Sequence, residues 1–142
     1  MRALLDINVL IALLDGGHSH HARALEWFLV HARSGWASCP LTQNGCLRIL
    51  SQPGYARPLP LLAVAERMRT FTSAPAHAFW PDSPSVLDPE AVRLDRIHGP
   101  TQITDSYLLA LAVAHGGRFV TFDERIAIST VPGARPEHLV RP

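Results

Sequence analysis

The chain has 142 residues, of which 47% are hydrophobic, and a formal net charge of +1. This length and composition predict one compact domain spanning residues 1–142. The small charge excludes the strong basic excess that is typical of dedicated nucleic-acid-binding proteins. All 13 basic residues are Arg, which can bind phosphate through two parallel hydrogen bonds. Codon bias explains the same composition, and we favour that cause.

The cysteine content and the N-terminal segment indicate the cellular compartment of the protein. Cys39 and Cys46 are too few for a disulfide framework, so we expect buried thiols in a reducing compartment, although their pairing stays an open alternative. The apolar first residues are interrupted by Asp6 and Asn8, are too short to span a bilayer and lack a cleavage site. We therefore expect a cytoplasmic protein with no membrane partner.

Short apolar runs alternate with helical patterns along the first half of the chain. Ala3 to Leu5 form an apolar run that ends at Asp6, and Asn8 then stands where it can cap a helix running to Leu14. The patterns that follow predict a helix over 20–33, a strand over 36–39, helices over 41–50 and 61–71, and a strand over 78–80.

The second half continues the alternation. A helix is expected over 89–97, with Pro89 in its first turn. The strongest helical pattern covers 101–115, includes Asp105 in its opening segment and ends at a pair of glycines. A strand over 118–122 then leads to Asp123. Strands alternating with helices, without hairpin dipeptides, predict an α/β fold with a mainly parallel sheet.

Three aspartates lie where such a fold places its ligand sites. Asp6 and Asp123 each follow a predicted strand, and Asp105 begins the helix that precedes the second of these strands. The carboxyl ends of parallel strands meet at one edge of the sheet, so we expect the three carboxylates to converge. Two such charges near 4 Å repel by about 4 kcal/mol at an effective dielectric of 20. A shared proton or a hard divalent cation would relieve this repulsion, and we favour Mg²⁺ or Mn²⁺.

Neighbouring residues can support this site. Asn8 and Thr121 are placed to assist through hydrogen bonds, and Arg118 and Arg125 flank Asp123, where they could contact a phosphate. Each also has an ordinary structural explanation, which for the two arginines is surface charge.

The acids themselves also have structural explanations. Asp105 suits a helix N-terminus, and Asp123 suits the cap of a following short helix. Asp6 lies inside an apolar segment, is expected to be partly buried and therefore needs partners. Taken together, the three aspartates favour a site.

Four segments carry a resemblance to a known family. They are Leu4 to Leu10 around Asp6, Cys39 to Gly45 with the sequence Cys-Pro-Leu-Thr-Gln-Asn-Gly, Thr104 to Ala110, and Thr121-Phe122-Asp123. In this order they resemble VapC-type toxins of the PIN-domain family, particularly those of mycobacteria, and the match runs from Met1 to about Arg125. The resemblance implies a three-layer PIN-like sandwich, in which a central sheet is flanked by helices, and a homodimer.

The same resemblance implies a function. It predicts a Mg²⁺- or Mn²⁺-dependent endoribonuclease that cleaves structured cellular RNA and is inhibited by a VapB-type antitoxin. Asp6 and Asp105 match the metal-binding acids of the family, Asp123 matches the last acid of the active site, and Thr121 matches a polar position beside it.

Gln43 departs from the family pattern, because similar toxins usually carry Glu at this catalytic position. Gln keeps the shape but cannot accept a proton at neutral pH, and it leaves the site one carboxylate short. Three explanations stand open: a deliberate substitution that silences a toxic enzyme, which we favour, a natural divergence with reduced activity, or a site that works with three acids. We therefore expect a weakened or silenced enzyme.

Two other functions are alternatives to the nuclease. A haloacid-dehalogenase-type phosphatase needs a second Asp at the position of Asn8, and the chain has no Lys to support that chemistry. The second rival is a PIN-like module that binds RNA or an antitoxin but no longer cuts, and Gln43 keeps that alternative open.

Overall fold

The computed structural model describes residues 1–142 and has a parallel five-stranded sheet at its centre. The strand order is β3-β2-β1-β4-β5, with β1 pairing with both β2 and β4. The strands are β1 (Ala3–Leu5), β2 (Trp36–Ser38), β3 (His77–Phe79), β4 (Arg118–Val120) and β5 (Leu139–Val140). The predicted α/β fold with a mainly parallel sheet is confirmed.

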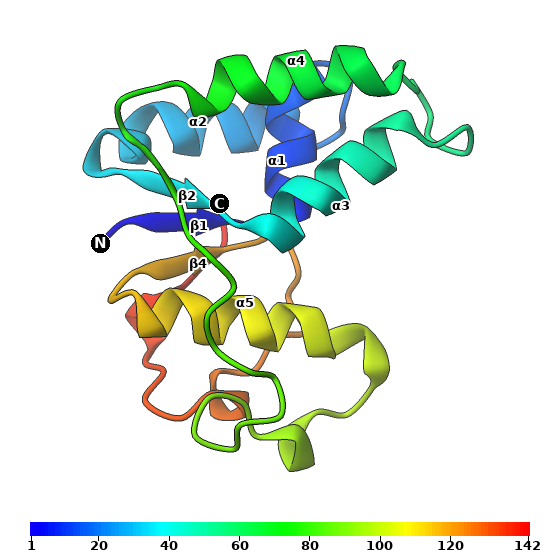
Figure 1. Cartoon of the computed structure of the whole chain (residues 1–142). Coiled ribbons are helices and arrows are strands. Elements are labelled where there is room, and N and C mark those ends of the chain that lie inside the picture. Colours follow the sequence, from blue (N-terminus) through cyan, green and yellow to red (C-terminus); the bar gives the residue numbers. More distant parts are fainter.

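Helices cover both faces of the sheet, so the predicted three-layer arrangement is also confirmed (Figure 1). One layer holds four helices, and α5 (Ile103–Ala114) lies on the opposite face. The four helices are α1 (Ile7–Leu14), α2 (His21–His31), α3 (Pro40–Ser51) and α4 (Leu61–Thr72). No helix is long and apolar enough to cross a membrane.

Alternating side chains of the strands feed two apolar cores, one on each face. On the α1–α4 side, Leu5, Trp36 and Val120 pack with residues of the four helices. On the other side, Leu4 and Phe119 pack against α5, in which every residue from 106 to 112 is buried. A helix that is apolar on all sides must be covered on all sides, and the C-terminal segment that includes Val131 covers the face of α5 turned away from the sheet.

The helices α1 and α3 are in close contact beside the carboxyl edge of the sheet. A Cβ atom on Gly45 would lie 2.3 Å from Cδ1 of Ile7, far inside van der Waals contact. The two helices can therefore approach this closely only because position 45 has no side chain. Ile7 directly follows Asp6, so the part of α3 around Gly45 lies beside the carboxyl end of β1.

Two expectations about local structure were wrong. Residues 89–97 form turns and a short 3₁₀ helix (Leu94–Arg96) instead of an α-helix. Asp88 Oδ1 accepts from the Glu90 amide, and the Asp88 carbonyl accepts from the Val92 amide, as at the start of a helix. The Arg93 amide, however, donates to the Thr130 carbonyl, so a tertiary contact ends the helical path after one turn. The cap of α1 is Asp6, and Asn8 lies inside the first turn.

Candidate active site

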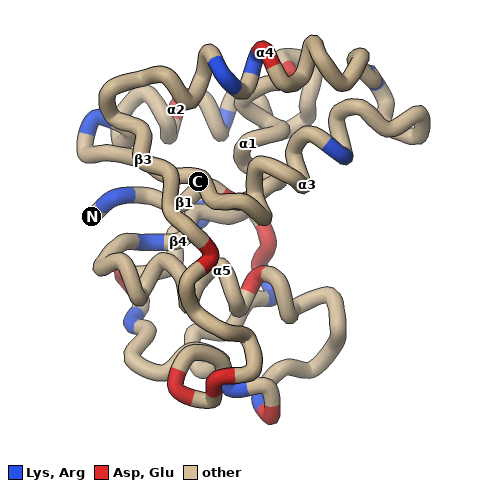
Figure 2. The backbone as a smooth tube through the Cα atoms, in the orientation of Figure 1, with Lys and Arg blue, Asp and Glu red and all other residues tan.

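The site lies where the sheet changes its winding direction, between the adjacent strands β1 and β4. Asp6 follows β1 and donates its amide to the Val120 carbonyl over 2.9 Å, which ties the two strand ends together. Ligand sites in open parallel sheets occur at such switch points. Acidic positions gather on this side of the molecule, between α3 and α5 (Figure 2).

Asp6 is the buried member of the cluster, with a relative exposure of 4%. Its Oδ1 accepts the Ile7 amide over 2.7 Å as the cap of α1, and its Oδ2 accepts the Thr121 hydroxyl over 2.6 Å. Burial raises the pKa of Asp6 to about 6, although these two hydrogen bonds act in the opposite direction. The negative charge of Asp123 raises this pKa further.

Asp105 and Asp123 complete the cluster. Asp105 lies in the first turn of α5, and burial, followed by the charges of Asp6 and Asp123, raises its pKa to about 7. The Arg125 side chain holds the pKa of Asp123 below its usual value by hydrogen bonding to the carboxylate. Asp6 and Asp123 are joined through the Thr121 hydroxyl, which bonds the Asp6 carboxylate and the Asp123 amide, and the charges of both acids act on Asp105. The predicted convergence of Asp6, Asp105 and Asp123 is therefore present in the structure.

Thr121 connects these acids to Asn8. Its hydroxyl donates to Asp6 and accepts from Asn8 Nδ2 over 3.2 Å and from the Asp123 amide over 3.0 Å. Asn8 Oδ1 in turn accepts the Phe122 amide over 3.2 Å. The orientation of Asp6 and the path of the chain into Asp123 thus depend on one buried hydroxyl group.

The donor set fits a hard divalent cation. Asp123 is already paired with Arg125, with Nη2 and Oδ2 separated by 2.7 Å, whereas neither Asp6 nor Asp105 forms an ion pair. No three His, Cys, Asp or Glu side chains form a ready-made metal-binding cluster. Mg²⁺, however, is typically held by only one or two carboxylates with water completing its shell. Asp6 and Asp105 are therefore the residues that could hold such an ion.

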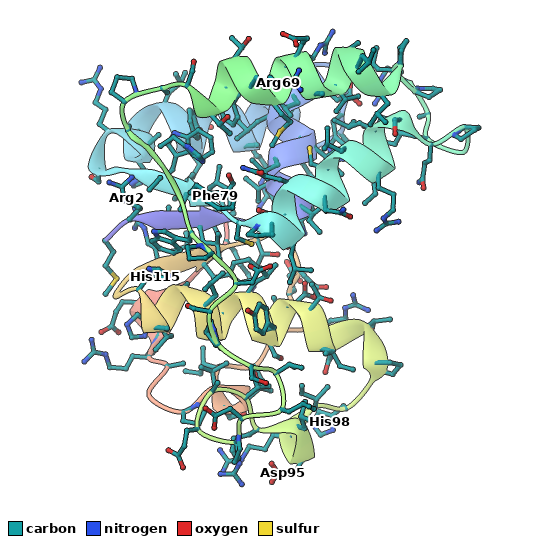
Figure 3. The ribbon with its side chains drawn as sticks, viewed as in Figure 1. Arg2, Arg69, Phe79, Asp95, His98 and His115 are labelled. Carbon is teal, nitrogen blue, oxygen red and sulfur yellow. The ribbon has the colours of Figure 1, made fainter.

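Gln43 lies in the first turn of α3 at the same edge of the sheet. Its Nε2 donates to Ser38 Oγ over 3.0 Å, and it makes no hydrogen bond to the three aspartates. Gln43 also lines a groove of about 190 Å³ between α3 and α4, and Arg69 of α4 lines the same groove (Figure 3). The cysteines nearby, Cys39 and Cys46, are both free and buried.

The two predicted arginines are placed differently. Arg125 contacts Asp123 through its guanidinium and its backbone amide. Arg118 is the first residue of β4, at the end opposite Thr121, and its guanidinium lies over the Trp27 ring, 5.5 Å from the centroid. The structure therefore does not bring Arg118 to the acids.

Sequence reasoning missed a contact from the C-terminal end. The guanidinium of Arg141 donates to the backbone carbonyls of three residues in the loop that starts at Asp123, and Val140 accepts the Thr121 amide. The C-terminal end of the chain therefore stabilises the loop that carries Asp123. Strand β5 has two residues, too few to show a strand pattern in the sequence.

Comparison with known proteins shows the family of the chain. The model of the PIN domain matches residues 3–130. The chain belongs to the PIN-domain family, among its VapC-type members. It is 50% identical to ribonuclease VapC44 of Mycobacterium tuberculosis over 139 residues, which is 98% of each chain. It is also 41% identical to ribonuclease VapC39 of the same organism, over 94% of this chain and 96% of the relative.

Solved structures show the same fold at low sequence identity. The VapBC2 complex of Rickettsia felis, bound to a DNA fragment from its promoter, contains a chain that matches with a TM-score of 0.65 and 14% identity. This match covers 99% of our chain and 98% of the other. VapC20 of M. tuberculosis, a toxin that cleaves the sarcin-ricin loop, matches with a TM-score of 0.62 and 13% identity, over 94% and 99% of the two chains.

Proposed function

We propose that this chain is a Mg²⁺- or Mn²⁺-dependent endoribonuclease that acts on structured cellular RNA. The observation that carries the proposal is the pair formed by Asp6 and Asp105 at the carboxyl edge of the sheet. Both carboxyls have raised pKa values and neither has an ion-pair partner. The relatives VapC44 and VapC39 are named ribonucleases, which supports RNA as the substrate.

The residues of the site have separate tasks in this proposal. Asp6 and Asp105 hold the divalent ion, which supplies charge neutralisation and Lewis acidity at a phosphodiester. Thr121 orients the Asp6 carboxylate by donating to Oδ2, and Asn8 holds Thr121 in turn. Arg125 keeps Asp123 ionised and is exposed enough to contact a phosphate of the RNA.

Gln43 reduces this activity in our proposal. A glutamate at this position would add a fourth carboxylate and a group that can accept a proton, and the amide of Gln43 does neither. The binding module that holds RNA or an antitoxin without cutting is the second candidate function. The neutral Gln43 amide, bonded to Ser38 and to none of the acids, is the observation that favours it.

The partners are also part of the proposal. We infer a homodimer, and a VapB-type antitoxin that neutralises the chain. The likeness of the fold to a chain in the VapBC2 complex of R. felis supports this partner type.

The test compares three purified proteins on total RNA with Mg²⁺ or Mn²⁺: the parent chain, Gln43→Glu and Gln52→Glu. Gln52 is exposed at the end of α3, so it controls for the added charge. We expect defined new RNA ends with Gln43→Glu, little or no cleavage with the other two, and none in EDTA. Cleavage by none of the three would leave the binding module, and equal cleavage by all would show that Gln43 is not disabling.

A further inference from the structure

The side chains of Gln43, Ser38 and His77, which come from three different elements, form a hydrogen-bonded line. Gln43 Nε2 of α3 lies 3.0 Å from Ser38 Oγ of β2, and this oxygen lies 2.8 Å from Nε2 of His77 on the next strand, β3. Ser38 is completely buried, so its hydroxyl has no access to bulk water. The Ser38 hydroxyl must therefore find its partners within the protein, and they are Gln43 and His77.

With the amide nitrogen of Gln43 facing Ser38, the chemistry of the groups sets the direction of each hydrogen bond. An amide nitrogen only donates, so Ser38 Oγ accepts from Gln43. The Ser38 proton then has one remaining acceptor within reach, Nε2 of His77. A buried hydroxyl proton without an acceptor is unfavourable, so this nitrogen must be unprotonated. The line consequently runs from Gln43 through Ser38 to a neutral His77.

We propose that Ser38 and His77 are positioning residues for the side chain at position 43. They hold the amide nitrogen of Gln43 against the end of β2. The importance of this contact for catalysis rests on the proposed nuclease function. The hydrogen-bonded line itself does not depend on it.

A glutamate at position 43 would reverse the direction of both hydrogen bonds in the line. A carboxylate only accepts, so the Ser38 proton would turn towards it, and His77 Nε2 would have to donate to Ser38 Oγ. The backbone of Thr72 also interacts with the His77 ring in a way that favours the protonated form. With Glu at position 43, one ring nitrogen of His77 would face Ser38 Oγ and the other the backbone of Thr72, both as acceptors. The protonated ring, which donates from both nitrogens, would satisfy the two acceptors. His77 would thus supply the proton that balances an acid at position 43.

The surroundings of His77 oppose this charge in the present chain. Burial lowers the pKa of His77, and the Arg2 guanidinium, the charged group that faces the ring, lowers it further. The Trp36 ring, 4.4 Å away between centroids, covers one side. A neutral His77 therefore suits Gln43, and an added negative charge at position 43 must overcome both effects.

Long-range ¹H–¹⁵N NMR of the histidine rings tests the line without any need for activity. In the parent chain at pH 7.5 we expect His77 with its proton on Nδ1 and a bare Nε2. In Gln43→Glu we expect the pKa of His77 to rise by about one unit or more, which is tenfold in proton affinity. A proton on Nε2 in the parent, or an unchanged pKa in Gln43→Glu, would overturn the proposal.

Two further variants separate the hydrogen-bonded line from simple attraction between charges. Ser38→Ala removes the middle hydroxyl, so Gln43→Glu made in that background should shift the pKa of His77 by less than half as much as it does when Ser38 is present. An equal shift of the His77 pKa in both backgrounds would contradict the hydrogen-bonded line. Gln52→Glu adds the same charge elsewhere and should leave His77 unchanged. Because no RNA is involved, these results stand apart from the success or failure of the nuclease proposal.

Discussion

At the scale of single residues, Thr121 is the group on which the site geometry depends most directly. Replacing it with the similarly shaped Val removes the donor to Asp6 Oδ2 and the acceptor of the Asp123 amide. We expect Thr121→Val to lower the free energy of unfolding by about 1–3 kcal/mol and to weaken Mn²⁺ binding about 10- to 100-fold. Urea denaturation and calorimetric Mn²⁺ titration measure the two effects.

Thr130 offers a matched control for this substitution. It is also buried, and its hydroxyl donates to the Ala127 carbonyl over 2.8 Å, away from the acids. Thr130→Val should reduce stability but leave Mn²⁺ affinity unchanged. If the two variants lost Mn²⁺ affinity equally, Thr121 would have no special connection to Asp6.

Asp105 gives a prediction for pH. Its carboxyl has a pKa of about 7 in the folded state, above the ordinary 3.8, so the folded protein holds more protons than the unfolded chain between these values. Stability from this group is therefore full below pH 4 and lost as the pH rises through 7. In EDTA at pH 8, we expect Asp105→Asn to be more stable than the parent by about 1 kcal/mol, less than full linkage because the group is partly exposed.

Urea denaturation of both proteins at pH 5 and pH 8 measures this dependence. Asp105→Asn should lose less stability than the parent between the two pH values. Saturating Mn²⁺ should reverse the order at pH 8, because only the parent gains a bound ion. A parent that is the more stable protein at pH 8 in EDTA would contradict the raised pKa.

The single residues also show what a sequence can reveal about a site. Asp6 and Asp123 were predictable because each follows a strand, and strand ends share an edge. Arg118 was misplaced by the same reasoning, since nearness to Asp123 in sequence ignores that a strand separates its two ends by about 3.3 Å per residue. Ser38 and His77 were missed because they lie on adjacent strands and are far apart in the chain. Only the position of Ser38 at the end of β2 could have pointed to it.

At the scale of elements, the approach of α3 to α1 depends on Gly45. Gly45→Ala would place a Cβ 2.3 Å from Ile7 Cδ1 and push α3 away from the sheet edge. We expect a loss of about 1–3 kcal/mol in the free energy of unfolding, as is usual for overpacking, measured by urea denaturation. Gly16→Ala is the control, because nothing lies within 4 Å of its Cβ position.

Shortening the opposing side chain should repair this defect. Ile7→Ala leaves a cavity by itself, but combined with Gly45→Ala it removes the clash, so the double variant should be more stable than the sum of the two losses predicts. Strict additivity would show that the two helices do not meet at this point.

Elements with strong patterns were predictable and weak ones were not. α5 was predictable because apolar residues such as Leu108 and Leu111 follow a first turn that holds Asp105 and precede two glycines. The structure then buries every residue from 106 to 112. The expected helix over 89–97 failed because the Arg93 amide donates to the Thr130 carbonyl. This partner lies far along the chain, where no periodicity reveals it.

At the scale of the whole molecule, the proposed assembly can be weighed directly. We expect light scattering behind size exclusion to give twice the chain mass of 15.6 kDa, with the mass unchanged in Gln43→Glu because the substitution lies in the site. A mass of one chain at micromolar concentration would contradict the homodimer.

The central claim is that Asp6 and Asp105 hold a divalent ion that the nuclease activity requires. The most direct measurement is the cleavage rate of one defined RNA substrate by Gln43→Glu in Mn²⁺ and in EDTA. Two variants in the same background complete it: Asp6→Asn, and Asp95→Asn in the short 3₁₀ helix (Leu94–Arg96) on the far side of α5 from the α1–α4 layer (Figure 3). We predict Mn²⁺-dependent cleavage that survives Asp95→Asn and is abolished by Asp6→Asn in a protein that remains folded. Cleavage that persists in EDTA, or in Asp6→Asn, would contradict the account.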